Sequence, residues 1–361
     1  MEPREKPQTT VGELGESGVL ARVLAQLSEA SAVELGPGDD CAVLRHEGDI
    51  VVTTDTMIEG PDFRLAWHDG FELGWKLAAT NLSDVASMGA RPTALTVALA
   101  VPLETPVRLL ERIAEGLDAA CRALAPGCGV VGGDLGRAPV VTAAVTALGD
   151  LEGRVPVLRS GARAGDVVAY AGELGLAGLG LSLLFAEGLA SDGTASADAV
   201  PGLWAAHPEV LAAQLAPAPP IPLGVAAALG KATAMMDVSD ALSIDSERLA
   251  RASGVHIDFS AALLERGFGE QSGVVVPVEA MLHGGEDHGL LATFPAAVAL
   301  PAGFLPVGVV LEASKAGSSD EAGPTATSQV PGQDVARLSL DGETLIARGW
   351  DPYTVQYPGA A

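Results

Sequence analysis

The segment K-L-A-A-T-N-L-S-D-V-A-S-M-G-A-R-P, residues Lys76–Pro92, decides how the rest of the chain is interpreted. Its pattern predicts a helix over residues 72–88. Intervals of four, three and four residues would place on one face of this helix Leu77, Asn81, Asp84 and Met88. A carboxylate inside such an apolar helix needs a cation or several donors, because burial otherwise costs several kcal/mol or forces protonation. A single aspartate on a helix is more often exposed or paired with an arginine. The interpretation therefore depends on how many similar carboxylates the chain supplies.

Three further aspartates lie at the end or edge of predicted apolar strands. They are Asp40 after a Gly-Pro-Gly turn, Asp55 directly after Thr53 and Thr54, and Asp134 at the end of V-V-G-G-D. Carboxylate and hydroxyl oxygens are the ligands that Mg²⁺ prefers. We therefore expect a shared metal site, with separate structural roles for each carboxylate as the alternative.

The order of predicted elements indicates a mixed α/β fold. Strands are predicted at 50–54, 93–101, 130–134 and 140–148, with helices at 19–30, 72–88 and 104–124. In the second half, strands are predicted at 167–170, 234–240, 255–259, 290–294 and 304–311, and helices at 181–188 and 242–253. Residues 191–202 and 216–224 are rich in Pro, Ala and Gly and are predicted to be connections, and 313–334 a polar loop. A length of 361 residues suggests two domains, which we place at residues 1–155 and 156–361 with the nucleotide between them.

Composition excludes several classes of partner. The chain has 46 acidic against 21 basic residues and a formal net charge of -25, which disfavours nucleic acid and an anionic membrane surface. The stretch 171–190 contains charges and glycines, so it is a poor membrane span. Three cysteines without C-x-x-C spacing and no apolar signal core suggest a reducing, cytoplasmic compartment.

More carboxylates occur in the second half of the chain. Asp237 and Asp240 flank Ser239 at a predicted strand end, and a glycine turn presents Glu286 and Asp287. Neither G-x-x-x-x-G-K-[ST] nor a G-x-G-x-x-G after a strand is present. Four of the histidines lie in unremarkable contexts, namely His46, His68, His207 and His256. An acidic protein of this kind would hold polyphosphate through several Mg²⁺ ions rather than through lysines.

The same motifs occur in a familiar order. G-P-G-D-D-C-A-V-L, T-T-D-T-M-I-E-G, N-L-S-D-V-A-S-M-G-A-R-P, V-G-G-D, R-S-G-A-R-A-G-D, M-D-V-S-D, G-G-E-D and G-W-D follow one another along the chain. From Val11 to Tyr353 the chain resembles the thiamine-monophosphate kinase family, within the aminoimidazole-ribonucleotide-synthetase-like ATP-binding superfamily. The resemblance implies ATP-dependent phosphorylation of thiamine monophosphate to thiamine diphosphate. It also implies a homodimer, with a β-rich N-terminal domain that dimerises and a C-terminal α/β domain.

The resemblance further implies roles for residues at matching positions. Those implied to bind Mg²⁺ are Asp40, Thr53, Thr54, Asp55, Asp84, Asp134, Asp237 and Asp240. Those implied to contact ATP are Gly133, Asp134, Arg159 and Ser239. Glu286 and Trp350 would contact the thiamine part of the substrate. The alternative for Trp350 is a purely structural role, in which the indole packs the C-terminal tail against the core. Catalysis would depend chiefly on Asp84, Asp134, Arg159 and Asp240.

The chain departs from the family pattern at four places. Asp62 stands where the family has a histidine near the substrate, so Asp62 is our candidate for that contact. Ala241 replaces a glycine, His288 and Gly289 replace Tyr and Glu, and no basic residue precedes Pro222. The metal carboxylates are all retained, so the changes concern the substrate side more than the ATP side.

Two alternatives remain open. The chain could be another ATP-using enzyme of the superfamily with a different acceptor, although the first 34 residues lack the cysteine of a selenophosphate synthetase and the G-W-D-P-Y tail lacks that of a hydrogenase-maturation relative. It could also be a non-catalytic nucleotide-binding relative. Retention of the carboxylates argues against this, because they are costly to bury without metal.

Overall fold

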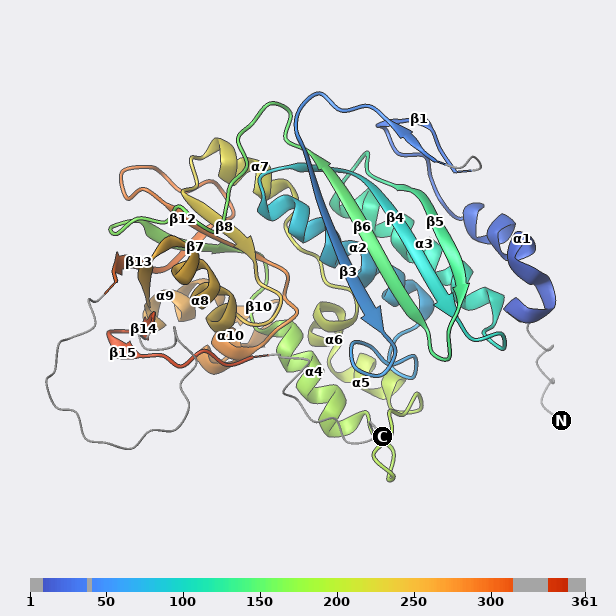
Figure 1. Cartoon of the computed structure of the whole chain (residues 1–361). Helices are drawn as coiled ribbons and strands as arrows, with labels where there is room; N and C mark the ends of the chain where they lie inside the picture. The colour runs from blue at the N-terminus through green and yellow to red at the C-terminus, as the bar shows by residue number, and fades with distance from the viewer. Residues whose placement is uncertain (1–8, 38–40, 314–336, 350–361) are drawn as a thin grey trace, which may run out of the picture.

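The computed structural model of the chain describes residues 9–37, 41–313 and 337–349. Two large sheets with helices packed against them confirm the predicted mixed α/β class (Figure 1). The loop predicted at 313–334 lies, beyond its first residue, outside the described part. No helix that the structure describes is both long and apolar enough to cross a membrane.

The first sheet has four strands in the order β3-β6-β4-β5. They are β3 (Ile50–Ile58), β6 (Thr142–Asp150), β4 (Arg91–Val101) and β5 (Val130–Arg137). The β4–β5 pair is parallel and is joined through helix α3 (Val107–Leu124), whereas β6 runs antiparallel to both β3 and β4. Helices α2 (Gly70–Ser87) and α3 cover one face, and Figure 1 views the sheet from the opposite face.

Helix α2 is the most enclosed helix among the residues that the structure describes, and it confirms the helix predicted in this region. Fourteen of its eighteen residues are buried, because it packs on α3, on the first sheet and on strand β8 of the second sheet. A capping box between Asp69 and Glu72 begins the helix, and Gly89, at φ 75°, follows its end. The polypeptide then enters β4, so Arg91 and Pro92 belong to a strand.

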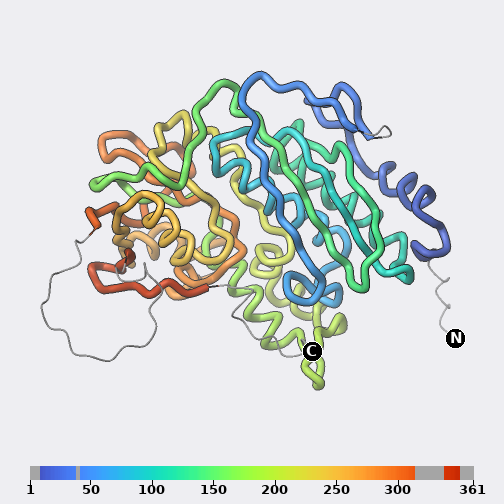
Figure 2. The backbone as a smooth tube through the Cα atoms, in the orientation of Figure 1, coloured from blue at the N-terminus to red at the C-terminus, as the bar shows by residue number. Residues whose placement is uncertain are grey.

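The second sheet has seven strands in the order β15-β14-β9-β13-β7-β12-β8. They are β7 (Val167–Ala171), β8 (Ala234–Asp237), β9 (Val255–Phe259), β12 (Leu290–Phe294), β13 (Leu305–Glu312), β14 (Leu338–Leu340) and β15 (Glu343–Thr344). The pairs are antiparallel except for β14 with β9. Residues 151–166 carry the chain from the first sheet to the second (Figure 2).

One hydrophobic cluster joins the two halves of the chain. It contains Leu82 and Val85 of α2 together with Met235 of β8 and Ala292 of β12. The division at residue 155 therefore stays a prediction.

The smaller elements surround this framework. Three helices accompany the second sheet in sequence, namely α8 (Leu242–Ser253), which coincides with its prediction, α9 (Ala261–Phe268) and α10 (Val278–His283). Two short antiparallel pairs are formed by β1 (Val33–Leu35) with β2 (Val43–Leu44) and by β10 (Glu270–Gln271) with β11 (Val274–Val275).

Two helices begin inside the connections that proline content suggested. Helices α5 (Val200–Ala206) and α7 (Pro222–Leu229) begin within 191–202 and 216–224, so those predictions are wrong at their C-terminal ends. Helix α6 (Pro208–Leu215) lies between the two segments, where the sequence predicted no helix. Each of these helices has proline in its first turn. Proline there lacks only an N–H that would have no partner in the helix, so it begins a helix rather than breaking one.

Two other helices begin earlier than predicted. Helix α1 spans Val11–Leu24 rather than 19–30, because Thr10 and Glu13 form a capping box. Helix α4 spans Leu176–Glu187 rather than 181–188, and the added residues include Gly178 and Gly180. One of them, Gly180, lies so close to α6 that a Cβ would come within 2.2 Å of the Val210 carbonyl oxygen.

Strands β3 and β5 are longer than predicted, and this changes which face their side chains occupy. Pairing with β6 continues through Ile58, so Asp55 lies within β3 rather than at its end. Alternation along the strand then places Thr53 and Asp55 on the face toward α2, and Thr54 on the opposite face. Asp134 likewise lies within β5, which continues to Arg137.

Helices α2 and α3 touch through a pair of glycines. A Cβ on Gly74 would lie 1.9 Å from the carbonyl oxygen of Ile113, and a Cβ on Gly116 would lie 2.0 Å from that of Phe71. Both clashes are with backbone, which cannot rotate away. This contact sets how closely α2 approaches α3.

We predict that Gly116→Ala lowers the free energy of unfolding by about 1–3 kcal/mol, because the added methyl group forces the helices apart. The matched control is Gly202→Ala in α5, where a Cβ would meet open space. The control should be stabilising by up to about 1 kcal/mol from helix propensity alone. Urea unfolding followed by circular dichroism measures both, and equal effects of the two substitutions would contradict the glycine contact.

Candidate active site between the two sheets

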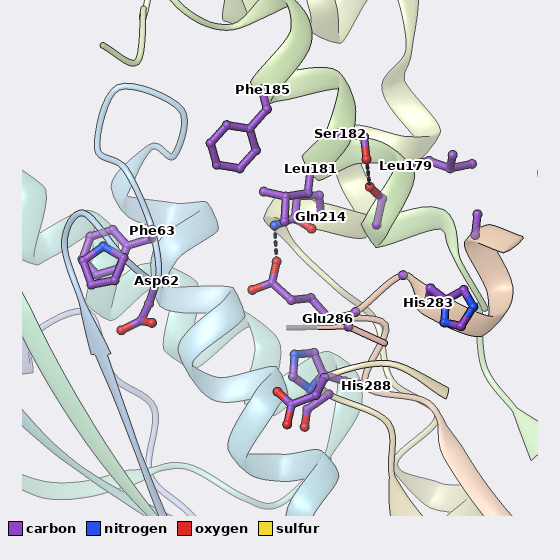
Figure 3. Close-up of a pocket in the computed structure, with 18 of the residues that line it drawn as sticks. Asp62, Phe63, Leu179, Leu181, Ser182, Phe185, Gln214, His283, Glu286 and His288 are labelled. Carbon is purple, nitrogen blue, oxygen red and sulfur yellow. Dashed lines mark hydrogen bonds between the residues drawn. The ribbon is translucent and has the colours of Figure 1, made fainter. Parts of the chain in front are cut away.

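A cavity of about 700 Å³ lies where the first sheet meets the second half of the chain. Five of the residues selected from sequence line it, namely Asp55, Asp62, Ser239, Asp240 and Glu286. They come from β3, from the connection that follows it, from the loop after β8 and from the turn before β12. Figure 3 shows Asp62 on one side of this cavity and Glu286 near its centre, below helix α4.

A cluster of carboxylates lies at one end of this cavity, where α2 passes β3 and β8. Asp84 of α2 accepts a hydrogen bond from the Thr53 hydroxyl, with 2.8 Å between Oγ1 and Oδ2. Ser83, the preceding residue, donates from Oγ to Asp237 Oδ2 at 3.2 Å. The structure therefore brings Thr53, Asp84 and Asp237 together around one turn of α2, as the metal hypothesis requires.

This cluster carries more negative charge than its surroundings neutralise. Burial and the neighbouring charges of Asp237 and Asp55 raise the pKa of Asp84 to about 7. Burial and the charge of Asp237 also raise the pKa of Asp55. A divalent cation would relieve this repulsion, and three carboxylates with a hydroxyl form a donor set that suits Mg²⁺.

The side chains are not drawn together as they would be around a bound ion. Within residues 9–37, 41–313 and 337–349, no three His, Cys, Asp or Glu side chains are close enough to share one ion. Mg²⁺ coordination by this cluster therefore stays a prediction.

The loop after β8 is held by a buried carboxylate that sequence reasoning did not select. Asp245 of α8 accepts hydrogen bonds from the backbone N–H of Ser239 at 3.1 Å and of Asp240 at 3.0 Å. Arg248 donates from Nη1 to Asp240 Oδ2 at 2.5 Å and to Asp245 Oδ1 at 2.7 Å. Burial and the charges of Asp237 and Asp240 raise the pKa of Asp245 to about 6. Asp240 therefore lines the cavity, and its carboxylate is paired with the guanidinium of Arg248.

The turn before β12 has a strained backbone that aims two side chains into the cavity. Glu286 and His288 both have positive φ, 68° and 53°, which non-glycine residues seldom adopt. Backbone hydrogen bonds from Glu286 N to Ser239 O (2.7 Å) and from His288 N to Val238 O (2.9 Å) hold the turn. Asp287, between them, points away and accepts from the N–H of Gly175 and Ala177 at the start of α4.

Lys76 is a site residue that sequence reasoning missed. Its side chain is fully buried, and Nζ lies 3.1 Å from Glu286 Oε1 and 3.0 Å from the carbonyl oxygen of Gln214. A sequence signal was available, because a polar stripe at intervals of four, three and four runs along α2 through Lys76, Thr80, Ser83 and Ser87. All four are buried, which identifies the stripe as the face toward the second half of the chain.

Three of the predicted site residues lie away from the large cavity. Thr54 is on the face of the first sheet opposite α2, where Oγ1 lies 2.8 Å from Thr146 Oγ1. Gly133 and Asp134, on the edge strand β5, line a second cavity of about 340 Å³ between the sheet, α1 and α3. Gly133 packs so tightly on β4 that a Cβ would lie 2.0 Å from the Val97 carbonyl oxygen.

The remaining predicted residues are not placed in either cavity. Arg159 is exposed in the segment between β6 and β7, and its carbonyl oxygen accepts a hydrogen bond from Ser253. Asp40 and Trp350 lie outside the described residues.

Comparison with known proteins identifies the family. Residues 38–151 match the family model "AIR synthase related protein, N-terminal domain". The chain is 38% identical over 309 residues to the thiamine-monophosphate kinase of Mycobacterium tuberculosis, covering 84% of this chain and 87% of that protein. The chain belongs to the thiamine-monophosphate kinase family.

Further relatives agree with this assignment. The thiamine-monophosphate kinase of Corynebacterium glutamicum is 36% identical over 311 residues, covering 83% of this chain and 87% of that protein. Among solved structures, the enzyme from Stenotrophomonas maltophilia has a TM-score of 0.66 at 28% identity, covering 91% of this chain and 96% of that chain. AaThiL in complex with AMPPCP and TMP has a TM-score of 0.65 at 28% identity, covering 96% and 99%.

Two departures from the thiamine-monophosphate kinase pattern fall inside the large cavity. Asp62 Oδ2 accepts a hydrogen bond from the backbone N–H of Ile58 at 2.8 Å, and its pKa is raised by burial and by the charge of Glu286. The Nδ1 atom of His288 lies 3.8 Å from Asp237 Oδ2, between Glu286 and the carboxylate cluster. Burial lowers the pKa of His288, but Asp237 and Glu286 outweigh it and the net shift is upward.

We predict that Asp84→Asn raises the melting temperature of the metal-free protein at pH 8. A carboxylate whose pKa is raised by folding destabilises the native state as pH rises from its unfolded value of about 4 through its folded value of about 7. The difference between variant and wild type should therefore be absent near pH 4 and largest above pH 7.

Differential scanning calorimetry in a chelator measures this dependence. Added Mg²⁺ should then raise the melting temperature of the wild type but hardly that of Asp84→Asn. A variant that is less stable than the wild type at pH 8, or that responds equally to Mg²⁺, would contradict the charge cluster.

Proposed function

We propose that this chain transfers the γ-phosphoryl group of ATP to thiamine monophosphate, giving thiamine diphosphate and ADP. Membership of the thiamine-monophosphate kinase family supports the reaction. One observation in this chain supports the assignment most directly. Glu286, Asp240 and Asp55, the last a member of the carboxylate cluster, line the same cavity.

Mg²⁺ ions would neutralise charge on the two phosphate groups as they approach each other. We assign Mg²⁺ to Thr53, Asp55, Asp84 and Asp237, with Asp40, Thr54, Asp134 and Asp240 as further ligands. The acceptor is already an anion at neutral pH, so no strong general base is required. Phosphoryl transfer chiefly requires that the reacting groups are held in position and that their charge is neutralised. The residues of the chain would meet the first requirement by positioning the ions and the phosphates.

ATP would occupy the second cavity and the region that leads from it. Gly133 and Asp134 line that cavity, and its other walls are mostly apolar side chains of α1, α3 and β4, which suits a purine ring. Ser239 and Arg159 would contact the phosphates. Thiamine monophosphate would occupy the large cavity, with Asp62, Glu286 and Trp350 as its contacts.

A homodimer would bring these two parts together. Asp55 and Asp134 lie on the two edge strands of the first sheet, β3 and β5, with two strands between them, so they are about 14 Å apart at ordinary strand spacing. The sheet face opposite α2 carries small or apolar side chains such as Thr54, Ala98 and Val52, which is 63% exposed. A second copy packed on this face would set β5 of one subunit beside β3 of the other. ATP-dependent synthesis of a cofactor favours a cytoplasmic location.

The assay of choice incubates the protein with ATP, Mg²⁺ and thiamine monophosphate and separates the products by chromatography. We expect thiamine diphosphate to form, to disappear in a chelator, and to fall by about a hundredfold or more in Asp84→Asn. The control is Asp192→Asn, an exposed carboxylate in the loop after α4 that lines neither cavity, and it should leave turnover unchanged. No product from a protein that still binds ATP would overturn the proposal and favour another acceptor or a non-catalytic relative.

A second prediction concerns the departure at Asp62. Asp62→His removes a negative charge that faces Glu286, so we expect the KM for thiamine monophosphate to change while the KM for ATP does not. Asp62→Asn is the matched comparison, because it removes the same charge while its amide oxygen can still accept from Ile58 N, so it should change the same KM. If His and Asn variants both retain the wild-type KM, Asp62 is not a substrate contact.

A further inference from the structure

A lysine without any exposed surface lies behind the substrate cavity. Lys76 Nζ contacts Glu286 Oε1 at 3.1 Å and the Gln214 carbonyl oxygen at 3.0 Å, and Gln214 Nε2 donates to the other oxygen of Glu286. We propose that Lys76 is a positioning residue, which with Gln214 fixes the Glu286 carboxylate for recognition of a cationic or N–H-donating ring of the substrate. The proposal rests on the proposed function for the identity of that substrate.

The cost of burying Lys76 argues for a purpose beyond packing. An ammonium group loses its hydration when it is enclosed, and a single ion pair seldom repays that loss better than an apolar side chain of the same size. Leu73 and Leu77, the buried neighbours of Lys76 on α2, are apolar. Leucine or methionine would fill the same space, so the charge itself is what this position provides.

Lys76 and Gln214 keep the Glu286 carboxylate ionised and fix its orientation. Burial alone would raise the pKa of Glu286, but the charge of Lys76 and the hydrogen bond from Gln214 outweigh it, and the pKa is lowered. Each carboxylate oxygen has one protein donor, which uses two of about four lone-pair positions. The side chain remains 27% exposed, toward the cavity, where the other lone pairs can accept from a ligand (Figure 3).

The charges around this pair favour a ligand with a positive or N–H-donating ring. Asp62 faces Glu286 across the cavity and adds negative potential. Arg64, Arg348 and His288 line the same cavity and can carry positive charge. Burial and the charge of Lys76 lower the pKa of His68, another residue of the cavity wall, to about 3, so it is neutral. The thiazolium and aminopyrimidine rings of thiamine have the required chemistry.

The test compares Lys76→Met, Glu286→Gln and the double variant in the kinase assay. Lys76→Met should raise the KM for thiamine monophosphate by about tenfold or more, while the KM for ATP stays unchanged and kcat stays within about threefold. Because Lys76 acts through Glu286, the double variant should be no worse than Glu286→Gln alone. Lys231→Met removes an exposed lysine and serves as the matched control, with wild-type constants expected.

Two further measurements keep the test decisive. If Lys76→Met does not fold, Gln214→Met removes the other donor to Glu286 and should raise the same KM. Calorimetric binding of thiamine monophosphate reports recognition without turnover. A wild type that binds but forms no product would overturn the proposed function, yet weaker binding by Lys76→Met would still support the positioning role. Equal binding by wild type and Lys76→Met, or defects that multiply in the double variant, would overturn it.

Discussion

The structure depends on the burial of several negative charges at one point between its two sheets. Asp55, Asp84 and Asp237 repel one another there, and folding raises the pKa values of the first two. Such repulsion opposes folding at neutral pH unless a cation is present. In the proposed reaction, a chain with a net charge of -25 that handles two phosphorylated substrates would need the same cations for its chemistry. Stability and catalysis would then have a common requirement for metal.

Helix α2 is the element that makes this arrangement possible. One of its faces packs on α3 through Gly74 and Gly116, which fixes its position, while Ser83 and Asp84 face the carboxylates of both sheets. About two helical turns earlier, Lys76 contacts the Glu286 carboxylate. The same rigid helix thus relates the carboxylate cluster to the wall of the substrate cavity. The positive-φ turn at Glu286 completes that wall, and its strain is offset by backbone hydrogen bonds to the loop after β8.

Sequence reasoning succeeded where local periodicity and tertiary role agree. The apolar helix with an internal carboxylate and the strands 255–259 and 290–294 were predictable because their patterns reflect burial. It failed where periodicity does not reveal the partner of a side chain or a strand. Asp245 holds the loop that carries Ser239 and Asp240, six and five residues earlier, and no pattern in the sequence indicates those hydrogen bonds to the backbone. The strand ends at Thr53–Asp55 were also wrong, because pairing with β6 extends β3 beyond its β-branched core. That extension decides which face Thr54 occupies.

The most direct test of the metal cluster is anomalous diffraction from crystals grown with Mn²⁺ and a non-hydrolysable ATP analogue. Mn²⁺ prefers the same oxygen ligands as Mg²⁺ and gives an anomalous signal of its own. We expect at least one peak within about 2.0–2.4 Å of carboxylate oxygens of both Asp84 and Asp237. Anomalous peaks only at the nucleotide phosphates, with the three carboxylates left as they are in the metal-free fold, would contradict the account.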